Sequence, residues 1–261
     1  MRVIVLSAAV AALCVPMWAA DDVDAADIIK KFAAKELEFQ QARNNYTYRQ
    51  SVKMEEVNGG KWEEVDDIIF TPEGKRIEKV VYAPVITLRQ ISLSPEDVQD
   101  LRNVQPFVLT TPEIPLYDIA YLGKEKVDDI GCYTFSVKPK KLVSGKRYFE
   151  GQIWVDDQDL QIVKTYGKGV GITKGDQAFP KFETYREQID KKYWFPTYTR
   201  ATDTLHFKSG ESVPIRMTVR YQDYKKYEGR STIKFGDVVE DGKSTGTPPT
   251  TPPSVPPAKK K

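Results

Sequence analysis

The residue types that usually carry catalytic or metal-binding chemistry are scarce in this sequence. Its 261 residues include one histidine, His206, and two cysteines, Cys14 and Cys132. A serine hydrolase would need His206 as its base, and no G-x-S-x-G elbow occurs between a predicted strand and a predicted helix. A zinc site would need paired ligands at short spacing, but neither H-x-x-x-H nor C-x-x-C occurs. We therefore predict a protein that is not an enzyme and that uses no cofactor and no metal.

Two catalytic arrangements stay open as alternatives. Cys132 and His206 would make a thiol–imidazole pair, although no local signature accompanies either residue. The 37 Asp and Glu residues would allow a hydrolase that uses carboxylates alone. Scattered acids on the polar face of a sheet predict the same composition. The acidic run Asp156–Asp159 is interpreted as a plain turn, because a calcium loop would need a glycine and a distal glutamate.

Composition and the first twenty residues indicate a folded, exported protein. Hydrophobic residues make up 40% and charged residues 29%, with a net charge of +2 and interspersed signs. A small net charge with both signs mixed along the chain gives no strong positive potential, so nucleic acid is not favoured as a partner. Arg2 precedes the apolar run Val3–Val15, and small residues follow, which is typical of a secretory signal cleaved near Ala19 or Ala20. An uncleaved anchor is the alternative, although the run is short for a membrane span.

Hydrophobic periodicity predicts one long helix and then a mainly antiparallel β domain. In Ala25–Asn44, apolar residues recur at helical spacing, so one face should lie on the sheet while Lys35 and Glu36 lie opposite. Asp24 or Asp27 is the expected cap. From Tyr46 the period changes to two. The expected strands are Tyr46–Met54, Trp62–Thr71, Arg76–Tyr82, Val127–Pro139, Lys181–Ile189, Tyr193–Ala201, Thr202–Phe207 and Val213–Tyr224, with a hairpin at Arg147–Tyr166.

The remaining segments are expected to be helical, irregular or disordered. Thr87–Leu122 is an insert with a short helix after Ser94 and Pro95, and a second short helical or irregular piece at Ile114–Leu122. Lys168–Phe179 is rich in glycine and predicts a loop. The Thr/Pro-rich end with its terminal lysines predicts a disordered tail. The expected organisation is a signal peptide at 1–20, one domain at 21–236 and a tail at 237–261.

The order of these elements resembles the LolA/LolB/RseB-like lipoprotein-carrier superfamily. More narrowly, it is similar to outer-membrane lipoprotein-sorting proteins over Ala25–Lys234. The segments that carry the resemblance are Gly151–Asp156, the return strand Leu160–Lys164 and Tyr193–Pro196. The resemblance implies an α+β fold, an unclosed β-barrel or half-barrel with an N-terminal helix and short helices as a lid. The family's lid-latching arginine would correspond to Arg76 or Arg89.

The resemblance also implies a function and a location. It indicates a periplasmic, monomeric, non-enzymatic carrier that binds lipoprotein acyl chains or another lipid, with a membrane protein as a possible partner for cargo transfer. The alternative is an envelope-stress regulatory or scaffolding module that acts through protein contacts. Apolar residues on alternating strand positions are the predicted cavity wall. They are Tyr46, Tyr48, Phe135, Ile153, Ile215, Met217 and Val219.

Overall fold

The computed structural model describes residues 23–71, 73–102, 107–171 and 180–227 of the chain. The predicted signal peptide 1–20 and the predicted tail 237–261 lie outside these residues, as does most of the predicted glycine-rich loop. The signal peptide and the tail therefore stay predictions. The loop was predicted to begin at Lys168, but residues 168–171 lie in the strand Ile162–Gly171, because they pair with residues 147–150 across the hairpin; only the rest of the loop stays a prediction.

The first element is helix α1 (Ala25–Arg43), whose start follows ordinary capping chemistry. The Asp24 carboxylate accepts a hydrogen bond of 3.0 Å from the Asp27 backbone N–H, which satisfies a free donor of the first turn. One face of α1 is buried, as predicted. Glu36, which was predicted to face solvent, is also buried, and the reason lies in its partner described below. The buried side chains are Ile28, Phe32, Ala33, Glu36 and Phe39.

In the described part of the chain, ten strands follow α1, and two short helical elements separate the third strand from the fourth. The strands are β1 (Tyr46–Glu56), β2 (Lys61–Phe70), β3 (Arg76–Ile86), β4 (Tyr117–Val127), β5 (Ile130–Pro139), β6 (Arg147–Asp156), β7 (Ile162–Gly171), β8 (Phe182–Gln188), β9 (Trp194–His206) and β10 (Ser212–Lys226). The helical elements are α2 (Pro95–Arg102) and one 3-10 turn, η1 (Ile114–Leu116). As predicted, Ser94 caps α2, because its hydroxyl accepts a 3.1 Å hydrogen bond from the Asp97 backbone N–H.

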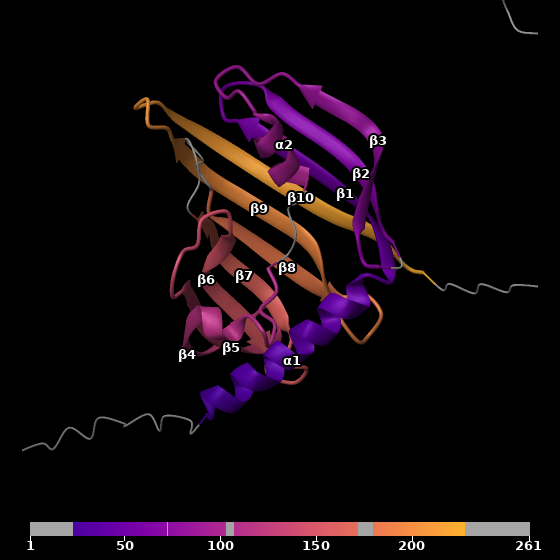
Figure 1. Cartoon of the computed structure of the whole chain (residues 1–261), viewed down its shortest axis with the longest axis vertical. Coiled ribbons are helices and arrows are strands. Elements are labelled where there is room, and N and C mark those ends of the chain that lie inside the picture. Colours follow the sequence, from indigo (N-terminus) through magenta and orange to yellow (C-terminus); the bar gives the residue numbers. More distant parts are fainter. Residues whose placement is uncertain (1–22, 72, 103–106, 172–179, 228–261) are drawn as a thin grey trace, which may run out of the picture. The chain divides into compact units, whose positions relative to one another are not determined.

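All ten strands belong to one antiparallel sheet in the order β3-β2-β1-β10-β9-β8-β7-β6-β5-β4 (Figure 1). The sheet is not closed, since β3 and β4 form its two edges. Within the described residues, every pairing joins consecutive strands except β1 with β10, where Val52 lies opposite Val219. Two meanders, β1–β3 and β4–β10, are thus joined along one seam. This is the unclosed antiparallel sheet with an N-terminal helix that the fold class predicts.

Strand alternation gives the sheet an apolar inner face, which α1 and α2 cover, and a more polar outer face. The even-numbered residues of β1 are buried, whereas the odd-numbered residues between them are partly exposed. The hairpin Arg147–Tyr166 is confirmed, with Phe149 and Ile153 of β6 facing inward. Figure 1 shows α2 over β1 and β10, while α1 lies toward the other half of the sheet. The inner face is therefore covered in two separate places.

Three predicted boundaries are wrong, and each has a physical reason. Ile114–Leu122 is helical only over η1, and β4 begins at Tyr117; outward residues of this edge strand, such as Leu122, are apolar and hide the alternation. Strand β3 runs through Pro84 to its end at Ile86, because an edge strand tolerates the missing N–H of proline. The two strands predicted on either side of Ala201 form the single strand β9.

Among the described residues, no helix combines the length and the apolar character needed to cross a membrane.

Candidate functional site

The half of the inner face beneath α1 is firmly packed. Phe32 of α1 contacts Phe135 of β5 with ring centroids 5.6 Å apart, and Phe39 contacts Phe195 of β9 edge-on at 5.3 Å. All four side chains are fully buried. Aromatic pairs in this geometry contribute about 0.5–1.5 kcal/mol beyond the area they bury. This part of the cover is a folded core.

A buried ion pair fixes α1 to β8. The Arg186 guanidinium donates to both carboxylate oxygens of Glu36, the shortest contact being 3.0 Å, and both side chains are almost completely buried. Glu36 also accepts a hydrogen bond from the Ile162 backbone N–H of β7, and Arg186 donates to the Phe107 carbonyl. Sequence reasoning missed this pair, because only the fold brings residues 150 positions apart together.

The half of the inner face beneath α2 is covered more lightly. We call Tyr48, Val52, Trp62, Ile68, Val219 and Tyr221 the α2-side cluster; all six are buried on β1, β2 and β10. The residues of the cover segment, 87–102, that pack against this cluster are themselves only partly buried. They are Leu88, Leu93, Val98 and Leu101. This contrast makes the cover segment the part of the cover that separates most easily from the sheet.

Polar contacts at the end of α2 hold the cover segment on the sheet. The Arg102 guanidinium pairs with the Glu64 carboxylate of β2 at 2.9 Å, and Glu64 is fully buried. The Arg102 carbonyl accepts hydrogen bonds from Gln50 at 2.9 Å and from Arg76 at 3.0 Å. Arg76, one of the two latching arginines offered from the sequence, therefore reaches the cover segment. Arg89, the other, lies in the cover segment and is held through its backbone.

That backbone contact belongs to Glu56 at the end of β1. Its carboxylate accepts hydrogen bonds from the backbone N–H groups of Arg89, Gln90 and Ile91 at 2.7–3.1 Å, and from Gly60 at 2.9 Å. Burial alone would raise the pKa of Glu56. The hydrogen bonds from these backbone donors together outweigh burial, so the pKa of Glu56 lies below its ordinary value. Glu56 thus holds the start of the cover segment on the sheet, and Arg102 holds its end.

Asp66 of β2 is the least satisfied carboxylate under the cover segment. It is 1% exposed, and its Oδ1 has no hydrogen-bond partner among the described residues. Burial, and then the charge of Glu64 two residues away, raise its pKa to about 6. Glu64 and Asp66 are neighbouring carboxylates on one strand face, but both are buried, so a substrate would reach them only if the cover segment moved.

The seven predicted wall residues all lie on the inner face and are buried, but they do not form one wall. Phe135 and Ile153 pack beneath α1, and Tyr46 packs with Phe39 and Phe195 near the end of that helix. The remaining four lie at the β1–β10 seam or beside it. They are Tyr48 and Val219 in the α2-side cluster, Ile215 in the adjoining cluster with Met54, and Met217 opposite Met54 and Ala201.

The Cys132–His206 alternative is wrong. Cys132 lies on β5 and His206 on β9, with β6, β7 and β8 between them, a separation of roughly 19 Å at the usual strand spacing. Cys132 is buried on the outer face with Trp154 and Trp194, and burial raises its pKa to about 11. His206 contacts Ser212, its exposed cross-strand neighbour, at 2.8 Å. Within the described residues, no cluster of His, Cys, Asp and Glu forms a candidate metal site.

No family model and no curated protein matches the sequence. Solved structures do resemble it. A DUF1329 family protein from Desulfovibrio piger is 13% identical, with a TM-score of 0.41, over 80% of this chain and 96% of its own. A LolA superfamily protein from Nitrosomonas europaea is 14% identical, with a TM-score of 0.36, over 78% and 94%. An outer membrane lipoprotein-sorting protein domain from Vibrio parahaemolyticus is 13% identical, with a TM-score of 0.36, over 77% and 94%.

At 13–14% identity, these likenesses concern the fold alone.

Proposed function

We propose that the protein is a periplasmic, non-enzymatic carrier that binds acyl chains, those of a lipoprotein or of another lipid, against the α2-side cluster. The observation that supports this most directly is the difference between the two halves of the cover. Beneath α1 the helix places the fully buried side chains of Phe32 and Phe39 against the sheet, together with the buried Glu36–Arg186 pair. The cover segment holds the other half through partly buried side chains and a few polar contacts.

Ligand binding then exchanges one apolar contact for another. The cover segment moves off the α2-side cluster, and the acyl chain takes the place of Leu88, Leu93, Val98 and Leu101 against the strands. Each methylene that leaves water contributes about 0.8 kcal/mol, so a long chain compensates for the displaced contacts. Handing on the cargo requires the reverse step, in which the cover segment returns as the chain leaves.

Tryptophan quenching tests this proposal, because the three described tryptophans lie on opposite faces of the sheet. Trp62 is fully buried in the α2-side cluster, whereas Trp154 and Trp194 belong to the outer-face cluster with Cys132. A fatty acid that carries a nitroxide on its chain should quench the emission of the parent protein. The same probe should have little effect on Trp62→Phe, whose remaining tryptophans lie outside the site.

Equal quenching of parent and Trp62→Phe would place the probe elsewhere and contradict the proposal. No quenching at all would favour the second candidate, a regulatory or scaffolding module. For that function the edge strand β3 offers a surface, since Val81, Tyr82 and Ile86 are about half exposed or more, at 48%, 53% and 61%. An edge strand with free backbone groups can pair with a strand of another protein.

Loosening the cover segment should speed ligand uptake. Glu56→Gln keeps the shape of the side chain but removes the charge that holds the backbone N–H groups of residues 89–91. Hydrogen bonds to charged groups contribute about 1.5–3 kcal/mol each. Losing part of this stabilisation should raise the population of the state with the cover segment detached several-fold. Stopped-flow uptake of the nitroxide fatty acid, followed by Trp62 emission, measures the rate.

The matched control for this variant is Glu55→Gln. Glu55 is the neighbouring residue on the outer face and pairs with Lys53 at 2.6 Å. This variant should take up the probe at the parent rate. Equal rates for both variants would mean that the cover segment does not limit entry.

A further inference from the structure

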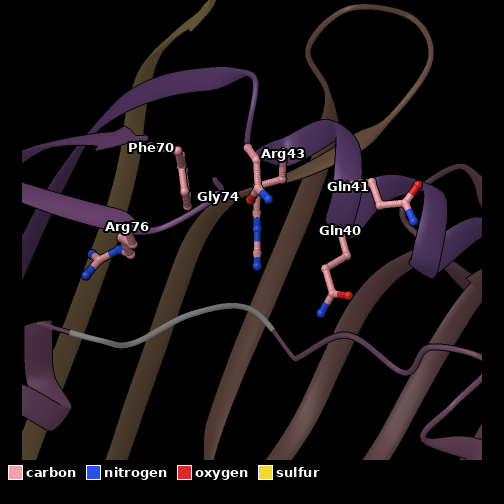
Figure 2. Close-up of a pocket in the computed structure, with 7 residues that line it drawn as sticks. Gln40, Gln41, Arg43, Phe70, Gly74 and Arg76 are labelled. Atoms are coloured by element: carbon pink, nitrogen blue, oxygen red, sulfur yellow. The ribbon is translucent and has the colours of Figure 1, made fainter. Parts of the chain in front are cut away.

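A polar cavity of about 250 Å³ lies where the end of α1 meets the β2–β3 turn. Gln40 and Arg43, which are three residues apart, project from the same side of α1, and Arg43 extends between Gln40 and Phe70 (Figure 2). At about 30 Å³ per water molecule, the volume is ample for a carboxylate or phosphate group. Its walls are formed by Gln40, Gln41, Arg43, Asn44, Phe70, Gly74 and Arg76.

Among the described residues, Arg43 is a cation without an ion-pair partner of its own. Its Nε is buried and has no hydrogen-bond partner among the described residues. The carboxylate that influences it, Glu36, is already paired with Arg186. Burial, together with the charge of Arg186, lowers the pKa of Arg43. A desolvated and uncompensated charge destabilises a fold, and a bound anion would remove that cost.

The cavity adjoins the proposed acyl-chain site through Phe70. This residue lines the cavity and also packs against the α2-side cluster. The protein therefore places a cationic, polar recess at one end of a covered apolar surface. This arrangement is complementary to an amphiphile that has an anionic headgroup and an apolar chain.

We propose that the Arg43 cavity binds an oxyanion, the carboxylate or phosphate headgroup of a ligand whose acyl chain passes Phe70 onto the α2-side cluster. The inference rests on the proposed function and adds the charge of the ligand to it. The planar guanidinium fork of Arg43 matches the two oxygens of such a group. Arg76 is already paired with Glu78 and donates to Gln50 and to the Arg102 carbonyl, so its role is to hold the cover segment.

The test compares two ligands that differ only in the headgroup. Binding of a nitroxide fatty acid and of its nitroxide fatty alcohol is measured by Trp62 quenching in the parent, in Arg43→Gln and in a control, Arg49→Gln. Arg49 lies on the outer face and pairs with Asp67 at 2.8 Å. The parent and Arg49→Gln should bind the acid at least tenfold more tightly than the alcohol. Arg43→Gln should bind both equally, with an unchanged affinity for the alcohol.

Inorganic phosphate distinguishes a lipid headgroup from a free ion. If phosphate raises the melting temperature of the parent but not of Arg43→Gln, while acid and alcohol bind equally, the cavity takes a free anion and the headgroup assignment is overturned. If acid and alcohol bind equally in every variant and phosphate has no effect, there is no oxyanion site. If neither amphiphile binds, the carrier function itself fails, and phosphate alone decides whether the cavity binds anions.

Discussion

Arg186→Met should destabilise the protein by about 3–5 kcal/mol, the largest loss that we expect from a single polar substitution. The variant leaves the Glu36 carboxylate fully buried, and within the described part of the chain the remaining donor to it is the Ile162 N–H. It also removes the donor to the Phe107 carbonyl. Because α1, β7, β8 and the segment at Phe107 all meet at this pair, the loss should affect the whole folded unit. Urea denaturation followed by circular dichroism measures it.

Second substitutions at these two positions test the physical reason. Glu36→Gln combined with Arg186→Met removes the stranded charge and keeps an acceptor for the Ile162 N–H, so it should recover most of the loss. Arg186→Lys should fall between the two, because a lysine keeps the charge but not the fork. Arg200→Met removes a side chain that is 58% exposed from Glu183, which keeps its other partner Lys164, so it should change stability by less than about 1 kcal/mol. Equal losses for Arg186→Met and Arg200→Met would contradict the interpretation.

Asp66→Asn should stabilise the protein at neutral pH by about 1–3 kcal/mol. The pKa of Asp66 is raised from 3.8 to about 6 in the folded state, chiefly by burial. Below about pH 4 the carboxyl is protonated in both states, so the parent and the variant should be equally stable. As the pH rises from 4 to 6, the unfolded chain releases the proton first, and the parent loses stability. Above pH 6 the full difference should be present.

The neighbouring residue, Asp67, supplies a control in which the change in stability should have the opposite sign. Asp67 lies on the outer face of β2, and its hydrogen bonds with Arg49 lower its pKa. Asp67→Asn should therefore be slightly less stable than the parent above pH 4, by less than about 1 kcal/mol. Urea midpoints between pH 3.5 and 7.5 measure both variants. A parent and an Asp66→Asn variant that stay parallel over this range would refute the proposed burial of charge.

The elements of the sheet could be predicted from the sequence wherever one strand face is apolar and the other polar. In β10, Val213, Ile215 and Met217 alternate with exposed residues, and the predicted strand is confirmed. The prediction failed where this contrast is absent. The edge strand β4 carries apolar residues such as Leu122 on its exposed face, and β3 is exposed along most of its length, including Val81 and Tyr82. Edge strands lack one neighbour, so their sequences are less constrained.

The candidate site was harder to predict than the fold, because its decisive contacts join distant residues. The alternation identified the inner-face residues, and all seven predicted wall residues are indeed buried. The sequence does not show which of these residues pack beneath α1 and which pack beneath the cover segment, because that depends on where the two helices lie on the sheet. Glu36 illustrates the difficulty, since a charged residue near the middle of an amphipathic helix indicates a solvent face. Its partner, Arg186, becomes visible only when β8 is placed beside α1.

The seam between β1 and β10 has a consequence for the order in which the protein is made. The β1–β3 meander can pair as soon as residues 46–86 exist, since each strand follows its neighbour along the chain. The α2-side cluster needs Val219 and Tyr221 as well, which belong to the last strand. A chain still being synthesised therefore exposes the apolar residues of β1 and β2 without the strand that completes their cluster. The cluster forms only when both ends of the domain have been made and have met, so an unfinished chain lacks the surface that we propose for acyl chains.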